Sequence, residues 1–279
     1  MAILSDNHLH SSFSGDSDTP MEHMIAKGME LGLSSMCFTE HMDMDFVGSS
    51  LEELSSPEEL ANFEVDTDAF QDGLLYCQEK YRDKIKINFG IELGIQPHIS
   101  ERLSEYAGKY DFDFIIGSSH ICNRKDPYFP TFYENRSEEE AYREYFTSIL
   151  TSINSFHDFD IYGHLDYVVR YGPNKDAKYT YDKYKDILDK ILITLIDMGK
   201  GIEVNTGAIN YKLKELNPCT DVIKQYKKLG GEIITVGSDA HRPDAICNGF
   251  KRAEEVLLSA GFEYYTTFNK RKAEYHKLK

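Results

Sequence analysis

The stretch AILSDNHLHSSFSGDS, residues 2–17, begins with a short apolar run and continues into a polar segment with two histidines, His8 and His10. The run has the length and residue types of a buried strand, and the Ser, Gly and Asp after it are typical of a loop. Alternate residues of a strand point to the same side, so the two imidazoles can face one position. A single pair at this spacing is more often structural than ligating, so its meaning depends on the rest of the chain.

Six further runs rich in β-branched and aromatic residues follow along the chain. They are SSMCFTEH (34–41), IKINFGIELG (85–94), FDFIIGSSH (112–120), FDIYGHLD (159–166), GKGIEVNTG (199–207) and GGEIITVGSDAH (230–241). Most are separated by segments whose apolar residues recur at helical spacing, which is the alternation expected of parallel strands with crossover helices. The sequence therefore predicts an α/β fold with seven parallel strands.

Four of the intervening segments have a clear helical pattern. The first begins at Thr19, with the spacing of a capping box and with Pro20 at the first helical position. The others span residues 137–156, 185–198 and 219–229.

Two long loops, residues 43–61 and 123–135, are predicted to interrupt this alternation, and loops after strands are where α/β enzymes carry substrate contacts. Their side chains include Asp45, Glu52, Tyr128 and Tyr133, and no spacing selects among them. We find no linker or internal repeat, so residues 1–279 are predicted to form a single domain.

The composition excludes some classes of function. The net charge of −16, from 47 acidic and 31 basic residues, repels a polyanion, so nucleic-acid binding is not expected. A small phosphorylated substrate stays possible, because bound cations can reverse the sign of the field inside one pocket. Five scattered cysteines without a C-x-x-C pair predict buried thiols, and the lack of a leader or long apolar run predicts a cytoplasmic protein without membrane contact. The oligomeric state stays open.

Residues able to bind metals or substrate stand at the end of every predicted strand. In chain order they are His8 and His10, His41, Glu92, His120, His164 and Asp166, Asn205, and Asp239 and His241. In a parallel α/β barrel these ends converge on the face that carries catalytic groups. The other four of the ten histidines, His23, His98, His157 and His276, lie in helical or tail segments and are expected at the surface.

Together with Asp16, the set comprises six histidines and three carboxylates, which is too many for one tetrahedral ion. Two or three divalent metals are therefore predicted, and nitrogen and oxygen ligands suit zinc, manganese or iron without choosing among them. Asp166 is expected either to orient His164 or to contact substrate, and Asn205 is open in the same way. The charged segment Lys175–Lys185, with its tyrosines, is predicted to be a solvated face.

These motifs are similar in order and spacing to those of the PHP (polymerase and histidinol phosphatase) superfamily, and closely to its monofunctional histidinol-phosphate phosphatases. The resemblance covers nearly the whole chain and rests on HLH (8–10), SGD (14–16), FTEH (38–41), GIELG (90–94), GSSH (117–120), GHLDYVVRYG (163–172) and GSDAH (237–241). It implies a distorted (β/α)7 TIM-like barrel that holds three divalent metals.

The resemblance also implies how the ligands are shared among the ions. The first ion would be held by His8, His10, Glu92 and Asp239, the second by Glu92 as a bridging carboxylate with His120 and His164, and the third by Asp16, His41 and His241. Some members of the superfamily have His at the position of Asp16, and the carboxylate resembles the histidinol-phosphatase branch.

The activity implied is hydrolysis of L-histidinol phosphate to L-histidinol and phosphate, a step of histidine biosynthesis, by a hydroxide that bridges two ions. Glu92 and Asp239 would belong to the catalytic pair of ions. Arg170 would be a catalytic phosphate clamp, because guanidinium presents paired donors that match phosphate oxygens. Arg242 and His241 are further candidates for phosphate binding. The alternative for Arg170 is a surface ion pair with an acidic neighbour.

Two other functions remain open at this point. The chain could be a phosphoesterase of the same fold that acts on a nucleotide, a sugar phosphate or a phosphotyrosine, because fold does not fix substrate. It could also be a metal-loaded binding module without activity, but such a module would be expected to have lost ligands, and all nine positions carry competent ones.

Overall fold

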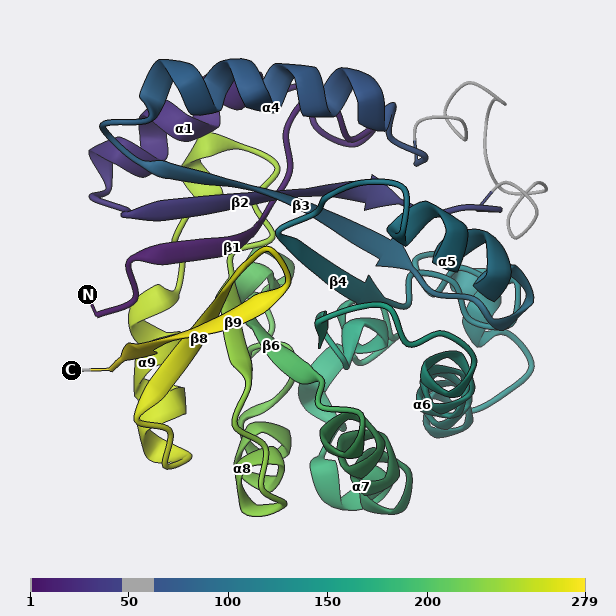
Figure 1. Ribbon diagram of the computed structural model, residues 1–279. Coiled ribbons are helices and arrows are strands. Elements are labelled where there is room, and N and C mark those ends of the chain that lie inside the picture. Colours follow the sequence, from purple (N-terminus) through teal and green to yellow (C-terminus); the bar gives the residue numbers. More distant parts are fainter. Residues whose placement is uncertain (1, 47–62, 279) are drawn as a thin grey trace.

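The computed structural model describes residues 2–46 and 63–278 (Figure 1). A seven-stranded sheet contains the strands in chain order, and each neighbouring pair is parallel. The strands are β1 (Ser5–Leu9), β2 (Ser35–Met42), β3 (Lys86–Gly94), β4 (Phe114–Ser118), β5 (Ile161–Tyr162), β6 (Gly201–Asn205) and β7 (Ile234–Gly237). All seven predicted strands are present.

The sheet closes on itself at the carboxyl ends of β7 and β1. The backbone N–H of Asp239 donates to the carbonyl of His8 at 2.9 Å, and that of His10 donates to the carbonyl of Ala240 at 3.0 Å. These bonds lie beside an isolated parallel bridge between Leu9 and Ala240. The predicted distorted seven-stranded barrel is confirmed.

Strand β5 is shorter than the predicted run of residues 159–166. It pairs with β4 and β6 only at Ile161 and Tyr162. The N–H of Gly163 still donates to the carbonyl of Gly117 at 2.9 Å, and the chain then turns, since the N–H of Tyr167 donates to the carbonyl of His164 at 2.7 Å. This turn takes His164 out of the strand and over the end of the barrel.

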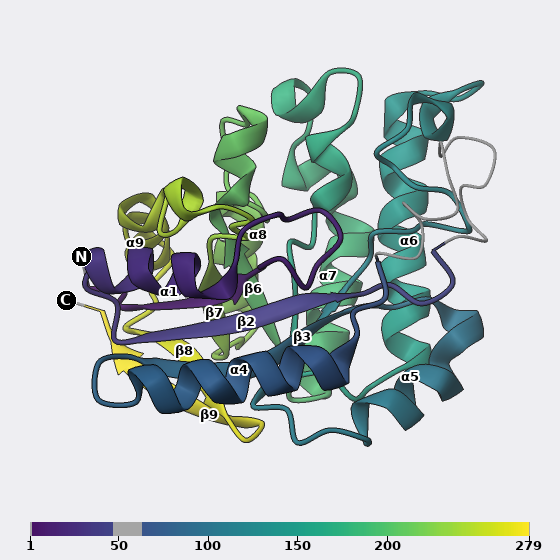
Figure 2. The ribbon, with the colours of Figure 1, turned by 90° about the horizontal axis from the view of Figure 1, so that it is seen from above.

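Helices surround the strands on the outside of the barrel (Figure 1). They are α1 (Met21–Glu30), α4 (Thr67–Tyr81), α5 (Ser100–Ala107), α6 (Glu138–Ser155), α7 (Tyr181–Asp197), α8 (Thr220–Lys228) and α9 (Phe250–Ser259). Figure 2 shows α1 and α4 running alongside β2 and β3. None of the helices in the described residues is long and apolar enough to cross a membrane.

Short 3-10 helices occupy the connections. They are η1 (Pro97–Ile99), η2 (Pro130–Tyr133), η3 (Tyr167–Arg170), η4 (Lys175–Ala177), η5 (Thr206–Tyr211) and η6 (Pro243–Ala245). The predicted loop 123–135 therefore contains one short helical turn. Most of the predicted loop 43–61, including Glu52, lies outside the described residues.

The predicted capping box at Thr19 is wrong. Helix α1 begins at Met21, and no side chain caps its first turn. The hydroxyl of Thr19 instead donates to the carbonyl of His241 at 3.1 Å, and the hydroxyl of Ser17 donates to the same oxygen at 2.7 Å. These polar residues therefore tie the loop after β1 to the loop after β7, which a pattern of helix capping cannot reveal.

A C-terminal hairpin of β8 (Tyr264–Asn269) and β9 (Lys272–Lys277) is absent from the prediction. Its strands are short and largely polar, so their pattern does not differ clearly from that of a surface tail. His276, which the sequence predicts at the surface of a tail, lies in β9 and is partly buried.

The hairpin, yellow in Figure 1, closes the amino-terminal end of the barrel. Phe268 of β8 stacks on Phe114 of β4, with ring centroids 4.9 Å apart, inside a small apolar cluster. At the tip, the guanidinium of Arg271 donates to Asp160 at 2.6 Å. One end of the barrel is thus filled, and the other carries the polar residues.

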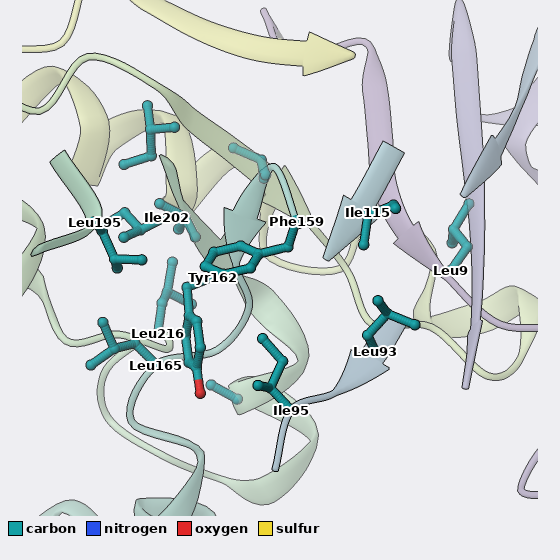
Figure 3. Close-up of a cluster of buried hydrophobic side chains, with 14 of the residues drawn as sticks. Leu9, Leu93, Ile95, Ile115, Phe159, Tyr162, Leu165, Leu195, Ile202 and Leu216 are labelled. Atoms are coloured by element: carbon teal, nitrogen blue, oxygen red, sulfur yellow. The ribbon is translucent and has the colours of Figure 1, made fainter. Parts of the chain in front are cut away.

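The main core lies between the barrel and its helices. In Figure 3 the rings of Phe159 and Tyr162 lie among Leu195, Leu165 and Ile95. Fully burying a side chain of this size contributes about 2 kcal/mol.

The segment Lys175–Lys185 is only partly the solvated face that we predict. Its lysines are exposed, but Tyr179, Tyr181 and Tyr184 are buried in the main core. The five cysteines are free thiols, four of them buried, as predicted.

Candidate metal centre

The nine predicted ligands lie together at the carboxyl ends of the strands. They come from β1 and the loop after it (His8, His10, Asp16), from β2 and β3 (His41, Glu92), and from the segments after β4, β5 and β7 (His120, His164, Asp239, His241). The ring of His10 stacks on those of His41 and His241, with both centroid distances 4.2 Å. Residues from both ends of the chain therefore share one site.

Four ligand atoms around His8 have the spacing of a tetrahedral shell. The distance from His8 Nε2 to Glu92 Oε2 is 3.2 Å and to Asp239 Oδ1 is 3.7 Å. His10 Nε2 lies 3.6 Å and 3.5 Å from the same two oxygens. Ligands about 2.0–2.2 Å from one tetrahedral ion lie about 3.3–3.6 Å apart, so this set matches one ion.

The second carboxylate oxygen of Glu92 faces a different pair of imidazoles. Glu92 Oε1 lies 2.8 Å from His164 Nε2 and 3.3 Å from His120 Nε2. The two ring nitrogens are 3.4 Å apart. Glu92 therefore stands between two groups of nitrogens with one oxygen toward each.

A third group lies at the edge of the site. Asp16 Oδ2 is 3.0 Å from His241 Nε2 and 3.5 Å from His41 Nε2. The side chains of Asp16 and His241 are 40% and 27% exposed, whereas those of His8 and Glu92 are 0% exposed. Asp16 and His241 are therefore more exposed to solvent than the ligands of the other two groups.

Several buried atoms that face this centre have no hydrogen-bond partner within the described residues. They include His8 Nε2, His10 Nε2, His41 Nδ1, Glu92 Oε2 and His241 Nε2. Leaving buried polar atoms unpaired costs about 1–3 kcal/mol each, and cations would satisfy them. Within the described chain, groups with metal-ligand spacing are His8/His10/Asp239, His8/Glu92/His164, His10/His41/His241 and His41/Asp43/His120. The residues present thus fit divalent metals.

The electrostatics of the centre also call for positive charge. Burial alone lowers the pKa of His8, but the carboxylates of Glu203, Glu92 and Asp239 raise it well above its usual value. Burial and the neighbouring imidazoles of His241 and His41 lower the pKa of His10, which keeps it neutral, as a ligand must be.

Two carboxylates that hold ligand imidazoles were missed by the sequence analysis. Glu203 Oε1 lies 2.7 Å from His8 Nδ1, and both oxygens of Asp43 lie 2.9 Å from His120 Nδ1. Such partners fix the orientation of a metal-bound imidazole and raise its basicity. The available signals were a carboxylate inside the apolar run of β6 and the two-residue spacing between Asp43 and His41.

Two glycines of the motifs make room for these carboxylates. A Cβ at Gly237 would lie 2.3 Å from Glu203 Oε1 and from His8 Cβ, and a Cβ at Gly94 would collide with the carboxylate of Asp43. The glycines of GSDAH and GIELG therefore allow each carboxylate to reach its imidazole.

Asp166 does not orient His164, so the first of its two predicted roles is wrong, and contact with substrate stays a prediction. Its carboxylate accepts from Asn217 Nδ2 at 2.6 Å and from the N–H of Cys219 at 2.9 Å, and it is fully enclosed. His164 Nδ1 is buried without a partner in the described residues. Asn205 lies in the centre, where its amide donates to Glu203 at 3.0 Å.

Arg170 is buried rather than on the surface, so the surface alternative is wrong. Its guanidinium donates to Asp239 Oδ2 at 3.0 Å and to the amide oxygens of Asn205 and Asn217 at 2.9 Å each. The rings of Tyr167 and Tyr211 lie on it at 5.2 Å and 5.0 Å. Its contact with phosphate stays a prediction.

The other predicted substrate contacts lie at the rim. Arg242 is exposed and pairs with Asp244 at 3.0 Å, and its contact with phosphate also stays a prediction. Tyr128 is exposed, whereas the hydroxyl of Tyr133 donates to the carbonyl of Val168 at 3.2 Å. Asp45 pairs with His98 at 2.6 Å on the surface.

A parallel barrel with carboxylates and imidazoles gathered at its carboxyl ends defines the class of metal-dependent α/β-barrel hydrolases. Residues 6–207 match the PHP domain family, and a relative that aligns with 98% of the chain at 33% identity is a histidinol-phosphatase. The chain belongs to the PHP domain family and, within it, to the histidinol-phosphatases.

The relatives cover nearly the whole chain. The histidinol-phosphatase of Lactococcus lactis is 33% identical over 273 residues, which cover 98% of this chain and 97% of that protein. The probable histidinol-phosphatase of Clostridium acetobutylicum is 32% identical over 255 residues, covering 90% and 91%. The crystal structure of the Lactococcus lactis histidinol phosphate phosphatase with zinc, L-histidinol and phosphate superposes with a TM-score of 0.85 at 29% identity, covering 98% and 99%.

Proposed function

We propose that this chain is a metal-dependent phosphomonoesterase that hydrolyses L-histidinol phosphate to L-histidinol and phosphate. The observation that carries the proposal is Glu92, whose two oxygens face separate groups of imidazoles. A carboxylate so placed fits a bridge between two ions about 3.5–4 Å apart, the arrangement common in enzymes that hydrolyse phosphate esters. The Lactococcus lactis relative, crystallised with zinc, L-histidinol and phosphate, supports the substrate.

The proposed ligand sets follow the three groups of side chains. His8, His10, Glu92 and Asp239 hold the first ion, Glu92 with His120 and His164 the second, and Asp16, His41 and His241 the third. Zinc, manganese and iron suit these nitrogen and oxygen ligands, and the relative supports zinc. Bound divalent cations supply a nucleophilic hydroxide near neutral pH and neutralise the phosphate oxygens.

The surrounding side chains position this centre. Glu203 and Asp43 hold the outer nitrogens of His8 and His120, so the inner nitrogens face the centre. Arg170 occupies Asp239 Oδ2, which leaves Oδ1 to face the imidazoles. We also propose that Arg170, and more weakly His241 and Arg242, bring positive charge to the phosphate.

A line of aromatic rings supports recognition of the imidazolyl group of the substrate. The ring of Tyr167 lies 5.0 Å from that of His164, the ring of Tyr171 lies 5.1 Å from Tyr167, and the exposed Tyr128 lies 5.3 Å from Tyr171. Aromatic rings at such separations offer faces and edges against which another ring can pack. The line leads from His164 to the exposed Tyr128.

Neither alternative function is favoured. The relatives that cover nearly the whole chain are histidinol-phosphatases, which supports this substrate over a nucleotide, a sugar phosphate or a phosphotyrosine. The complete ligand set argues against a binding module without activity. A cytoplasmic location is part of the proposal and is supported by the free thiols.

The experiment is release of phosphate from L-histidinol phosphate and from a panel of other phosphomonoesters, with and without a chelator. We expect a strong preference for L-histidinol phosphate, loss of activity with the chelator and recovery on adding back zinc or manganese. Equal rates across the panel would contradict the substrate, and activity that survives complete removal of metal would contradict the mechanism.

A further inference from the structure

Glu40, the residue before His41, is fully buried and does not belong to any of the ligand groups. Its carboxylate accepts from the N–H of Ser11 at 3.1 Å and 3.0 Å, from the hydroxyl of Ser11 at 2.5 Å and from the hydroxyl of Ser14 at 2.6 Å. Both serines lie in the loop that follows His10. Glu40 therefore joins the end of β2 to this loop behind the metal centre.

The hydroxyl of Ser14 lies between Glu40 and two of the proposed ligands. It accepts from the backbone N–H of His41 at 3.1 Å and lies 3.2 Å from His10 Nδ1. A serine hydroxyl has one hydrogen to donate, and Glu40 receives it. Toward His10, Ser14 can then only accept, so Nδ1 must carry the ring proton and Nε2 is left with its lone pair.

The position of the His10 ring is fixed independently. It stacks on both His41 and His241, at interplanar angles of 22° and 18°, so contacts with two rings hold its plane. Its Nε2 lies 3.6 Å from Glu92 Oε2 and 3.5 Å from Asp239 Oδ1. The tautomer of the ring is then determined by the hydrogen bond between Nδ1 and the hydroxyl of Ser14.

We propose that Glu40 and Ser14 form a positioning relay that holds His10 in the tautomer able to bind the first ion. The same hydroxyl fixes the backbone of His41, a ligand of the third ion, so the relay also links two ligand sets. Both residues are buried, so they act through the ligands that Ser14 contacts. The inference rests on the proposed function because it takes His10 as a metal ligand, and it extends to His10 the role that Glu203 has for His8.

The two serines provide a matched pair of variants for the test. Ser11 and Ser14 are both buried and both donate to Glu40, but of the two hydroxyls only that of Ser14 contacts His10 and His41. Zinc-loaded proteins are dialysed against increasing concentrations of chelator, and retained zinc is measured by elemental analysis. We expect Ser14→Ala to lose zinc at a chelator concentration about tenfold or more below that for the wild type, and Ser11→Ala to shift by less than about threefold.

Glu40→Gln tests whether the carboxylate acts through the serine. It should weaken zinc retention about as much as Ser14→Ala, and the double variant should be no worse than Ser14→Ala alone, because members of one relay are not additive. Equal retention in Ser14→Ala, Ser11→Ala and wild type would overturn the relay, as would fully additive losses in the double variant.

The wild-type protein gives a test that does not depend on whether the variants fold. Nitrogen-15 NMR of the imidazoles identifies the protonated ring nitrogen of His10, and we expect Nδ1 in both the metal-free and the zinc-loaded protein. A proton on Nε2 would overturn the relay.

Failure of the proposed function gives a different result. A wild-type protein that retains no divalent metal and releases no phosphate from L-histidinol phosphate would refute the function, whatever the tautomer of His10. A wild-type protein that does both, with a Ser14→Ala variant that holds zinc equally well, would refute the relay alone.

Discussion

The candidate metal centre has two parts that differ in burial and support. The inner cluster (His8, His10, Glu92, His120, His164 and Asp239) is buried, and Glu203 and Asp43 hold two of its imidazoles. In the outer cluster (Asp16, His41 and His241), Asp16 is 40% exposed, and His241 Nδ1 contacts the backbone carbonyl of Asp239 at 3.1 Å.

This difference indicates different tasks for the two clusters. A buried site strengthens each interaction between ligand and cation, and a carboxylate behind an imidazole makes it a stronger ligand. The outer cluster is less buried, and its imidazoles have less support from carboxylates behind them. We therefore expect the inner cluster to hold the ions that hydrolysis requires and the outer cluster to hold an ion that exchanges more easily.

The largest effect should follow from removing the carboxylate that joins the inner ligand groups. Glu92→Gln keeps the size of the side chain but weakens both proposed sites, so turnover of L-histidinol phosphate should fall by about 10³-fold or more. Steady-state kinetics and metal content check this. Asp160→Asn, a change of a buried carboxylate at the opposite end of the barrel, is the control and should leave the metal content at the wild-type level. Full activity in Glu92→Ala would refute the bridging role.

Arg170→Ala should have the next largest effect. It leaves Asp239 buried without its ion pair and removes positive charge beside the inner cluster, so kcat/KM should fall by about 10²-fold. Arg170→Lys keeps the charge but loses the contacts to Asn205 and Asn217. Comparing kcat with KM in both variants separates phosphate binding from positioning of Asp239. Unchanged kinetics in Arg170→Ala would remove this residue from the site.

The sequence predicts which side chains meet at the centre better than it predicts what holds them. His8, Glu92 and Asp239 were identifiable because each follows or ends an apolar run, and the fold brings all such ends to one face. Glu203, Asp43 and Glu40 form hydrogen bonds with residues from other strands or the loops after them. Only the fold brings these partners together. A local pattern therefore could not assign their partners.

The same limit explains the errors in the predicted fold. Thr19 has the local pattern of a helix cap, but the carbonyl of His241, distant along the chain, takes its hydroxyl. The β8–β9 hairpin has short polar strands, and its packing on Phe114 from β4 is visible only in three dimensions. Arg170 stands in a motif of the sequence, whereas its contacts with Asn205 and Asn217 depend on how the segment after β5 packs against β6 and the loop that follows it.

Glu203→Gln tests whether support from a carboxylate distinguishes the inner cluster. The amide cannot accept from His8 as strongly as the carboxylate does, so the affinity for zinc should fall by about 10-fold to 100-fold. Metal retention at fixed concentrations of chelator measures the effect. Glu232→Gln, at the surface in an ion pair with Lys227, is the control. An affinity equal to that of the wild type would mean that burial alone, without Glu203, makes the inner cluster tight.

The smallest effect is expected in the outer cluster. Asp16→Asn removes the charged group of the outer cluster, which lies beside His41 and His241. Because the ligands of the inner cluster are unchanged, the bound metal should fall from about three equivalents to about two. Graded chelation of the wild type should give the same order, with one equivalent lost first. If Asp16→Asn also loses the other two equivalents, the clusters are not independent, and the contact of His10 with His41 and His241 couples them. If turnover by Asp16→Asn falls in proportion to the lost equivalent, the third ion takes part in the reaction. Turnover within about twofold of the wild type would confine the chemistry to the inner cluster.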